Sequence, residues 1–137
     1  MAALKMSRDS KYRPSLRHHH RIDANLPVQL RTQSGDVIDT HLGNLSRAGM
    51  MAVCTPEMIQ LVLPAQESVS PHQPVPVDTT LFLKRQQGVE IRCDVIYVRR
   101  LSRDAFHLGM AFQDFGDDQQ RQAVEDYVSE HLSEPPA

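Results

Sequence analysis

Tryptophan is absent from this sequence of 137 residues, and aromatic side chains are scarce, with three tyrosines and four phenylalanines. Together with nine prolines, this scarcity argues against a compact helical bundle. The two cysteines, Cys54 and Cys93, lie far apart in apolar runs and have no CxxC spacing. This placement is typical of buried reduced thiols rather than of a disulfide.

Long apolar runs are also lacking. No stretch approaches the roughly 20 apolar residues of a membrane-spanning helix. The first residues, MAALKMSRDSKYR, contain no apolar core of the length found in signal peptides. We therefore expect a cytoplasmic protein that has no membrane partner.

Motifs that carry catalysis are missing as well. The sequence has no GxSxG, no phosphate-binding GxxxxGK[ST] loop, no HExxH and no GxGxxG after a predicted strand. The three histidines 18–20 would point in alternating directions in an extended segment, so they cannot easily converge on one metal ion. We therefore predict a protein that is not an enzyme and has no cofactor or metal.

The formal net charge of −2 hides a strong asymmetry. Residues 1–31 carry seven Lys or Arg and two Asp, a net charge of +5. Residues 114–137 carry seven Asp or Glu and one Arg, a net charge of −6. A basic front end attracts anions, whereas an acidic end is typical of a solvated helix face.

The pattern of apolar residues predicts one mainly β domain over 13–132, after a flexible basic arm at 1–12 and before a disordered tail at 133–137. About six short strands follow one another, interrupted at about 55–78 by a proline-rich insertion. The clearest alternation places five residues on one face: Val89, Ile91, Cys93, Val95 and Tyr97.

The period of the pattern changes near the end of the chain. Apolar residues fall at helical spacing in a predicted helix at about 117–132, with Asp117 as its N-cap and Gln120 three residues later. Six antiparallel strands and one closing helix predict a small β-barrel, because closure removes exposed strand edges.

Two groups of polar residues flank the first strands. Arg17 and Arg21 form an RxxxR spacing just before the first strand, and Asn44, Ser46 and Gly49 follow the second. Asn and Ser side chains can hydrogen-bond a base edge or a phosphate, and a glycine lets a ligand approach the backbone closely. By itself, an Asn-Ser-Gly cluster usually indicates only a turn.

This ordered pair of motifs resembles the signature of PilZ domains, RxxxR and [D/N]xSxxG, and the segment FHLGMAFQDF is similar to a later block of that family. The resemblance runs from about Arg17 to Leu132. It implies a six-stranded antiparallel β-barrel of the split-barrel type with a C-terminal α-helix. It also implies a receptor for cyclic di-GMP, a second messenger of bacteria.

The resemblance implies a role for each motif. Arg17 and Arg21 would bind phosphate oxygens through planar guanidinium groups and stack on guanine. Asn44 and Ser46 would read a guanine edge or a phosphate, and Gly49 would keep the surface open. Ligand binding would order the arginine segment and change the surface offered to a protein partner.

Three details of the motifs stay open. Arg13 forms a second RxxxR with Arg17, so the working pair is Arg13/Arg17 or Arg17/Arg21. Leu16 stands where family members often carry another arginine, which leads us to expect one ligand per chain. Arg47, inside the second motif, and Arg13 are possible secondary contacts.

Two other functions remain alternatives. The chain could be a barrel of the same fold that contacts a protein partner without binding a nucleotide. The basic arm could instead bind nucleic acid, but single-strand binders combine a basic groove with stacking aromatics, and only Tyr12 stands among these arginines. The intact motif residues favour the receptor over both alternatives.

Overall fold

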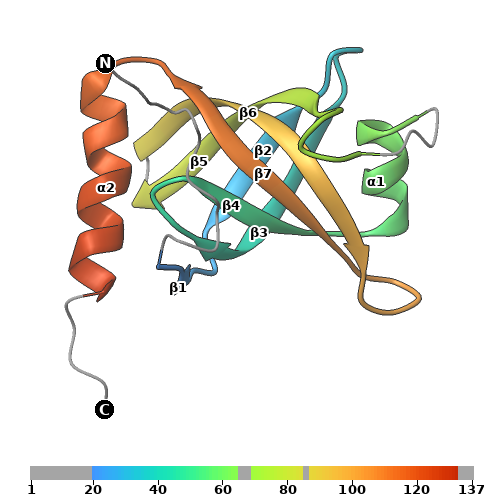
Figure 1. Ribbon diagram of the computed structural model, residues 1–137, viewed down its shortest axis with the longest axis horizontal. Coiled ribbons are helices and arrows are strands. Elements are labelled where there is room, and N and C mark those ends of the chain that lie inside the picture. Colours follow the sequence, from blue (N-terminus) through green and yellow to red (C-terminus); the bar gives the residue numbers. More distant parts are fainter. Residues whose placement is uncertain (1–19, 65–68, 85–86, 133–137) are drawn as a thin grey trace.

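The computed structural model describes residues 20–64, 69–84 and 87–132 and shows seven strands and two helices (Figure 1). In chain order they are β1 Ile22–Asp23, β2 Pro27–Arg31, β3 Val37–Leu45, β4 Gly49–Cys54, α1 Pro56–Val62, β5 Val75–Lys84, β6 Gln87–Arg100, β7 Phe106–Phe115 and α2 Asp118–Leu132.

The strands form one antiparallel sheet that closes on itself. Its order is β1-β3-β2-β5-β6-β7-β4, and β4 also pairs with β3. Strands β2 to β7 therefore form a six-stranded barrel, and β1 is a short addition at β3. The predicted fold class, a six-stranded antiparallel barrel with a C-terminal helix, is confirmed.

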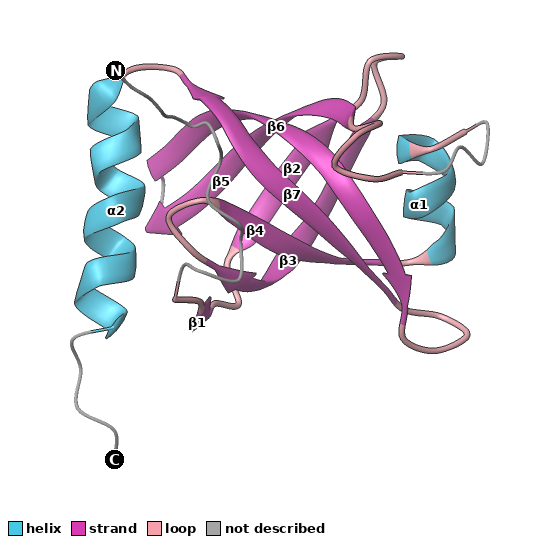
Figure 2. Cartoon of the chain, in the orientation of Figure 1, coloured by secondary structure: helices cyan, strands magenta, loops and turns pink. Residues whose placement is uncertain are grey.

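The two helices lie at opposite ends of the barrel (Figure 2). Helix α1 begins after Thr55, whose hydroxyl accepts a hydrogen bond from the Met58 amide at 3.2 Å. Val62 at its end and the following Leu63 are buried in the core. The first part of the segment that the sequence indicated as an insertion thus contributes to the core, and β5 already starts at Val75. Within the described residues, neither helix has the length and apolar character that spanning a bilayer requires.

The barrel interior is filled by one face of each strand, as alternation predicts. Val28 and Leu30 of β2 lie opposite Thr40 and Ile38 of β3, and the buried leucines Leu42, Leu45, Leu81 and Leu108 complete a continuous core. Burying one such side chain stabilises the fold by roughly 1.5–3 kcal/mol. This interior holds the strands in a fixed register, which decides what faces outward.

The predicted alternation of β6 is wrong at one residue. Val95 lies opposite Met110 of β7, but Tyr97 lies opposite Gly109, so the register shifts between Val95 and Tyr97. Such a bulge inserts one extra residue and reverses the side on which the following residues point. Met110 is fully buried, and Tyr97 therefore faces outward instead of joining Val95 in the core.

Helix α2 begins as predicted. The Asp117 carboxylate accepts a hydrogen bond from the Gln120 amide at 2.9 Å, which is the N-cap geometry. Val124 and Val128 are fully buried, and the helix packs against β1, β6 and β7. The acidic residues of α2 lie mainly on its other side.

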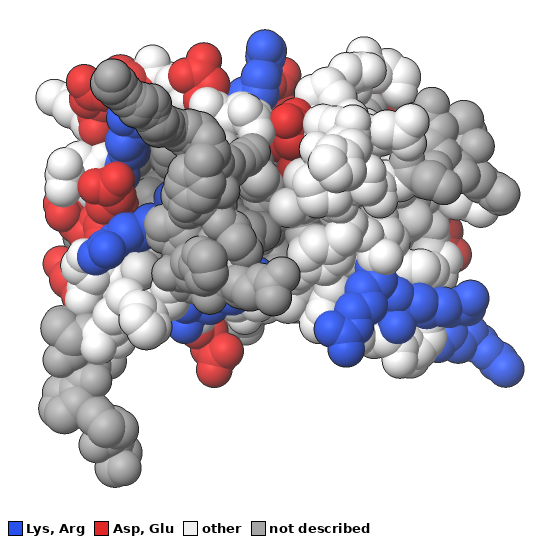
Figure 3. All heavy atoms as spheres, viewed as in Figure 1, with Lys and Arg blue, Asp and Glu red and all other residues white. Residues whose placement is uncertain are grey.

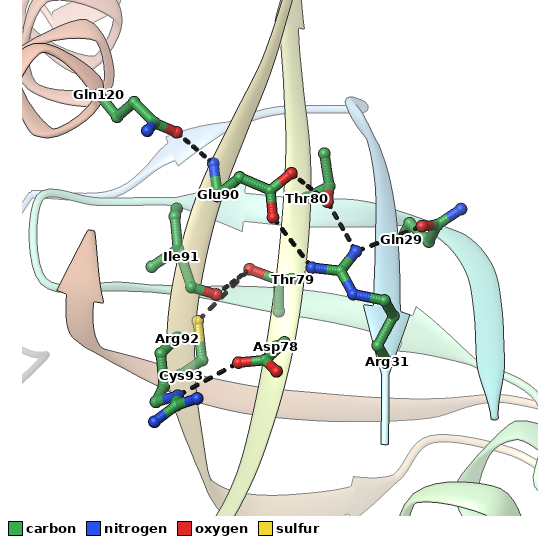
Figure 4. Close-up of polar contacts among 10 residues, drawn as sticks. All are labelled: Gln29, Arg31, Asp78, Thr79, Thr80, Glu90, Ile91, Arg92, Cys93 and Gln120. Atoms are coloured by element: carbon green, nitrogen blue, oxygen red, sulfur yellow. Dashed lines mark hydrogen bonds and ion pairs between the residues drawn. The ribbon is translucent and has the colours of Figure 1, made fainter. Parts of the chain in front are cut away.

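A network of polar side chains on the outside of the barrel joins α2 to the strands (Figure 4). Arg31 donates to the Thr80 hydroxyl at 2.8 Å and pairs with the Glu90 carboxylate at 2.9 Å. The Gln120 side chain accepts a hydrogen bond from the Glu90 amide at 2.6 Å. Cross-strand contacts of this kind fix the first turn of α2 against β6.

Candidate functional site

The second sequence motif lies at the hairpin between β3 and β4. Asn44 is near the end of β3, Ser46 and Arg47 are in the turn, and Gly49 begins β4. Gly49 does not have a positive φ, so its backbone conformation does not require a glycine. The glycine with a positive φ is Gly35. The motif therefore combines strand residues with a tight turn.

Ser46 holds this turn together. Its hydroxyl donates to the Gly49 carbonyl at 3.2 Å and accepts from the amides of Ala48 and Gly49 at 3.1 and 3.2 Å. The Ser46 amide also donates to the Gly49 carbonyl at 2.9 Å. A serine hydroxyl has one donor and two acceptor sites, and with 2% of its surface exposed, Ser46 uses all three in the turn.

A row of cross-strand neighbours runs over the outside of the barrel next to this turn. Asn44 of β3 lies opposite Met51 of β4, and Met51 lies opposite Gly109 of β7. Gly109 in turn lies opposite Tyr97 of β6. Side chains at directly opposed positions share one face of a sheet, so the four strands bring Asn44, Met51 and Tyr97 together.

Arg21 joins the same place from the start of the described chain. Strand β1 pairs with β3, with Asp23 opposite Asn44, so Arg21 comes next to the motif hairpin. Its side chain is exposed, and it lines a shallow surface depression together with Asn44, Ser46, Gly49, Met50, Met51 and Tyr97. Residues from the two sequence motifs thus meet at one surface. Arg13 and Arg17 lie outside the described residues.

Tyr97 is the site residue that sequence reasoning missed. A Cβ atom built on Gly109 would lie 2.0 Å from Cε2 of Tyr97, so the ring lies directly against the Gly109 backbone. The glycine of the block FHLGMAFQDF therefore makes room for an aromatic ring at the site. A glycine inside a strand often marks a place where another group approaches the backbone closely, so Gly109 could have indicated such a contact. That the contacting group is Tyr97 depends on the bulge in β6, which the sequence does not show.

Arg47 contacts the C-terminal helix. Its guanidinium donates to the Ser129 hydroxyl of α2 at 2.7 Å. Arg47 does not line the depression with Arg21 and Asn44. The contact instead links the motif hairpin to the C-terminal helix.

Burial shifts the pKa of three titratable groups among the described residues. His107 faces outward two residues before Gly109, and burial, followed by the Arg99 charge, lowers its pKa. Burial raises the pKa of Cys54 to about 11 and that of Cys93 to about 12. No cluster of His, Cys, Asp or Glu suited to a metal ion occurs among the residues that the structure describes.

Comparison with protein families gives one match. The model of the PilZ domain matches residues 15–130 of the chain. The chain belongs to the PilZ domain family. The match contains both motifs, the barrel and most of α2, which confirms the resemblance found in the sequence. No curated protein matches the sequence.

Solved structures show the same fold at low sequence identity. The inhibitor of motility MotI/DgrA of Bacillus subtilis is 17% identical with a TM-score of 0.63, over 88% of this chain and 52% of that chain. The PilZ domain of CeSA from a cellulose-synthesizing bacterium is 20% identical with a TM-score of 0.55, over 81% and 96%. The PilZ domain of YcgR from Escherichia coli, solved with c-di-GMP, is 12% identical with a TM-score of 0.56, over 86% and 92%.

The share of each solved structure that the chain matches differs. It spans about half the length of the Bacillus subtilis chain, and nearly the whole of the two separate PilZ domains. At these identities the likeness establishes the fold, while the role of each site residue has to be argued from this chain.

Proposed function

We propose that this chain is a receptor for cyclic di-GMP that passes the signal to a protein partner, without catalysis. PilZ domains are ligand-binding receptor domains, and the YcgR domain was solved with this ligand. The observation that carries the proposal for this chain is the meeting of Arg21, Asn44 and Tyr97 at one depression. A cation, an amide and an aromatic ring suit a ligand made of phosphates and guanines.

Each of these side chains has a task that follows from its chemistry. Arg21 binds phosphate oxygens through its planar fork, and Arg17 acts as its partner in the RxxxR motif. The Asn44 amide pairs with a guanine edge, since it offers both donors and an acceptor. The Tyr97 ring stacks on a guanine face.

Ser46 and Gly49 contribute mainly through the hairpin. Because the Ser46 hydroxyl is occupied by the turn, it positions Asn44 and the start of β4 instead of reading a base. Gly49 lines the depression without adding a side chain, which leaves room for a ligand. The depression is shallow, so most of a cyclic dinucleotide would lie above it and contact the arginine segment.

The signal to a partner uses the arginine segment and Arg47. Ligand binding orders residues 13–21 over the barrel, and Arg13 adds a secondary contact. If a phosphate draws the Arg47 side chain toward the ligand, its 2.7 Å hydrogen bond to the Ser129 hydroxyl of α2 breaks. The hairpin and the helix are then uncoupled, which alters the surface at that end of the barrel.

Isothermal titration calorimetry of cyclic di-GMP into the protein tests the proposal. Arg21→Ala removes one charge-assisted bidentate contact and should weaken binding by roughly ten- to a hundredfold. Arg103→Ala is the matched control, because Arg103 is an exposed arginine of the β6–β7 hairpin that does not line the depression, and it should bind as the wild type does. A stoichiometry of one per chain is expected, since Leu16 leaves no platform for a second ligand.

Absence of saturable heat in the wild type would overturn the receptor function. The chain would then be an interaction module of the same fold. Equal loss in Arg21→Ala and Arg103→Ala would show that binding follows the overall positive charge, as expected for nucleic acid. A stoichiometry of two would contradict the role assigned to Leu16.

A further inference from the structure

The hairpin between β6 and β7 carries a concentrated basic surface. Arg99 and Arg100 end β6, and Arg103 lies in the turn before β7 starts at Phe106. All three arginines are exposed, and Leu101 between them exposes 46% of its surface. Figure 3 shows these basic side chains gathered at the lower right of the molecule, over the β6–β7 hairpin and away from α2.

The hairpin turn is held in one shape by its own hydrogen bonds. The Leu101 and Ser102 amides donate to the Ala105 carbonyl at 2.9 and 3.2 Å. Arg100 donates to the carbonyls of Ser102 and Arg103 at 3.0 and 3.3 Å, and its guanidinium lies 5.5 Å from the centre of the Phe106 ring. A preorganised turn loses little entropy when it binds a partner.

Arg100 is therefore engaged within the hairpin, whereas Arg99 and Arg103 remain available. Within residues 20–64, 69–84 and 87–132, neither of these two side chains makes a hydrogen bond or an ion pair. The nearest acid in the turn is Asp104, and its amide is held by Ser102. The surface thus presents an exposed leucine with one available arginine on each side of it in the sequence.

The number and kind of exposed side chains distinguish the partner classes. Recognition of an anionic membrane takes a cluster of about four to eight basic residues, so two arginines and one leucine would hold the protein there weakly. Nucleic acid would meet two phosphate-binding groups, and the Phe106 ring of the hairpin already has the Arg100 guanidinium over one face, where a base would stack. A carboxylate matches the planar fork of an arginine bidentately, each such exposed pair strengthens binding by up to roughly fivefold, and an apolar neighbour can cover Leu101.

We propose that the β6–β7 hairpin is the docking surface for an acidic segment of a partner protein, with carboxylates for Arg99 and Arg103 and an apolar side chain against Leu101. The inference names the kind of partner for the proposed adaptor and rests on that role. Strands β6 and β7 also carry Tyr97 and Gly109 of the ligand site. The two surfaces therefore share the same pair of strands.

A tryptophan at position 101 provides a direct reporter, because the chain has none of its own. Leu101→Trp is titrated at low salt with a 15-residue peptide in which glutamates surround a leucine, and its emission is recorded. Leu61→Trp is the matched control, since Leu61 is an exposed leucine of α1, 40% exposed, without flanking arginines. A peptide with lysine in place of glutamate, phosphatidylglycerol vesicles and a duplex oligonucleotide are titrated in parallel.

The acidic peptide should shift the emission of Leu101→Trp to shorter wavelength and saturate, and should leave that of Leu61→Trp unchanged. Adding Arg99→Glu and Arg103→Glu should weaken this binding at least tenfold. A missing shift, an equal shift in Leu61→Trp, or a stronger response to vesicles or to the oligonucleotide would overturn the proposal.

Calorimetry with cyclic di-GMP separates this inference from the proposed function. Arg103→Glu should bind the nucleotide as the wild type does while losing affinity for the acidic peptide. If the nucleotide does not bind but the peptide does, the hairpin surface stands and the receptor function fails. If the nucleotide binds but the peptide does not, the receptor stands and the docking surface is refuted.

Discussion

Substituting alanine for Gly109 tests whether this glycine exists to seat Tyr97. The added Cβ would lie 2.0 Å from Cε2 and 2.4 Å from Cδ2 and Cζ of the Tyr97 ring, far below normal contact. Gly109 does not have a positive φ, so alanine introduces no backbone strain. The steric conflict that alanine creates is therefore with the Tyr97 ring.

The ring can respond in two ways, and both are measurable. If it stays, overpacking should lower the free energy of unfolding by about 1–3 kcal/mol. If it swings out, the loss of stability is smaller, but the guanine loses its stacking surface. Base stacking on an aromatic side chain is worth about 1–3 kcal/mol, which weakens cyclic di-GMP binding by roughly 5- to 150-fold.

A double-mutant cycle with Tyr97→Ala isolates the steric term. Urea unfolding and calorimetry are measured for the wild type, both single variants and the pair. In the Tyr97→Ala background, Gly109→Ala should cost almost nothing in stability or affinity, because the clashing ring is gone. If Gly109→Ala costs the same with and without the ring, the role assigned to Gly109 and Tyr97 is refuted.

Three further predictions concern the hairpin, the thiols and a histidine. Ser46→Ala removes three hydrogen bonds of the turn and should lower the free energy of unfolding by about 1–3 kcal/mol even without ligand; unchanged urea stability would contradict its positioning role. Cys54 and Cys93, whose pKa values burial raises to about 11 and about 12, should resist a thiol reagent at pH 8 until urea unfolds the protein, and rapid labelling of the native protein would contradict their burial. Because the folded pKa of His107 lies below 6.5, the unfolded state binds its proton first, so stability should fall as the pH drops below about 6.5. His107→Gln should fall less in the same urea titrations, and an identical fall would assign the effect to other groups.

The barrel could be predicted from the sequence because the residues that alternate as apolar along the strands are the ones buried in its interior. In β2 and β3, the residues Val28, Leu30, Ile38 and Leu42 alternate with polar neighbours, and all four are buried. The N-cap of α2 could also be predicted, because the Asp117 side chain binds a backbone amide only three residues later in the chain. Such features depend on a few neighbouring residues.

The candidate site could be predicted only in part, because its residues are brought together by the pairing register of strands that are far apart in the sequence. Asn44 was found through a motif, but Tyr97 could not be placed, since alternation alone put it in the core with Val95. The extra residue in β6 that turns Tyr97 outward follows from how β6 pairs with β7, and no local pattern announces a bulge. The hydrogen bond between Arg47 and Ser129 could not be predicted either, because the two residues are 82 positions apart in the chain.

The bulge in β6 also explains how one strand can serve two surfaces. After it, Tyr97 and Arg99 point outward and Val98 opposes the buried Leu108. Without the extra residue, the alternation would turn both Tyr97 and Arg99 into the barrel and expose Val98. An arginine turned into the barrel without a partner is unfavourable, so the bulge favours the register in which Arg99 faces outward. The same irregularity that completes the ligand depression therefore brings the arginine of the β6–β7 hairpin to the surface.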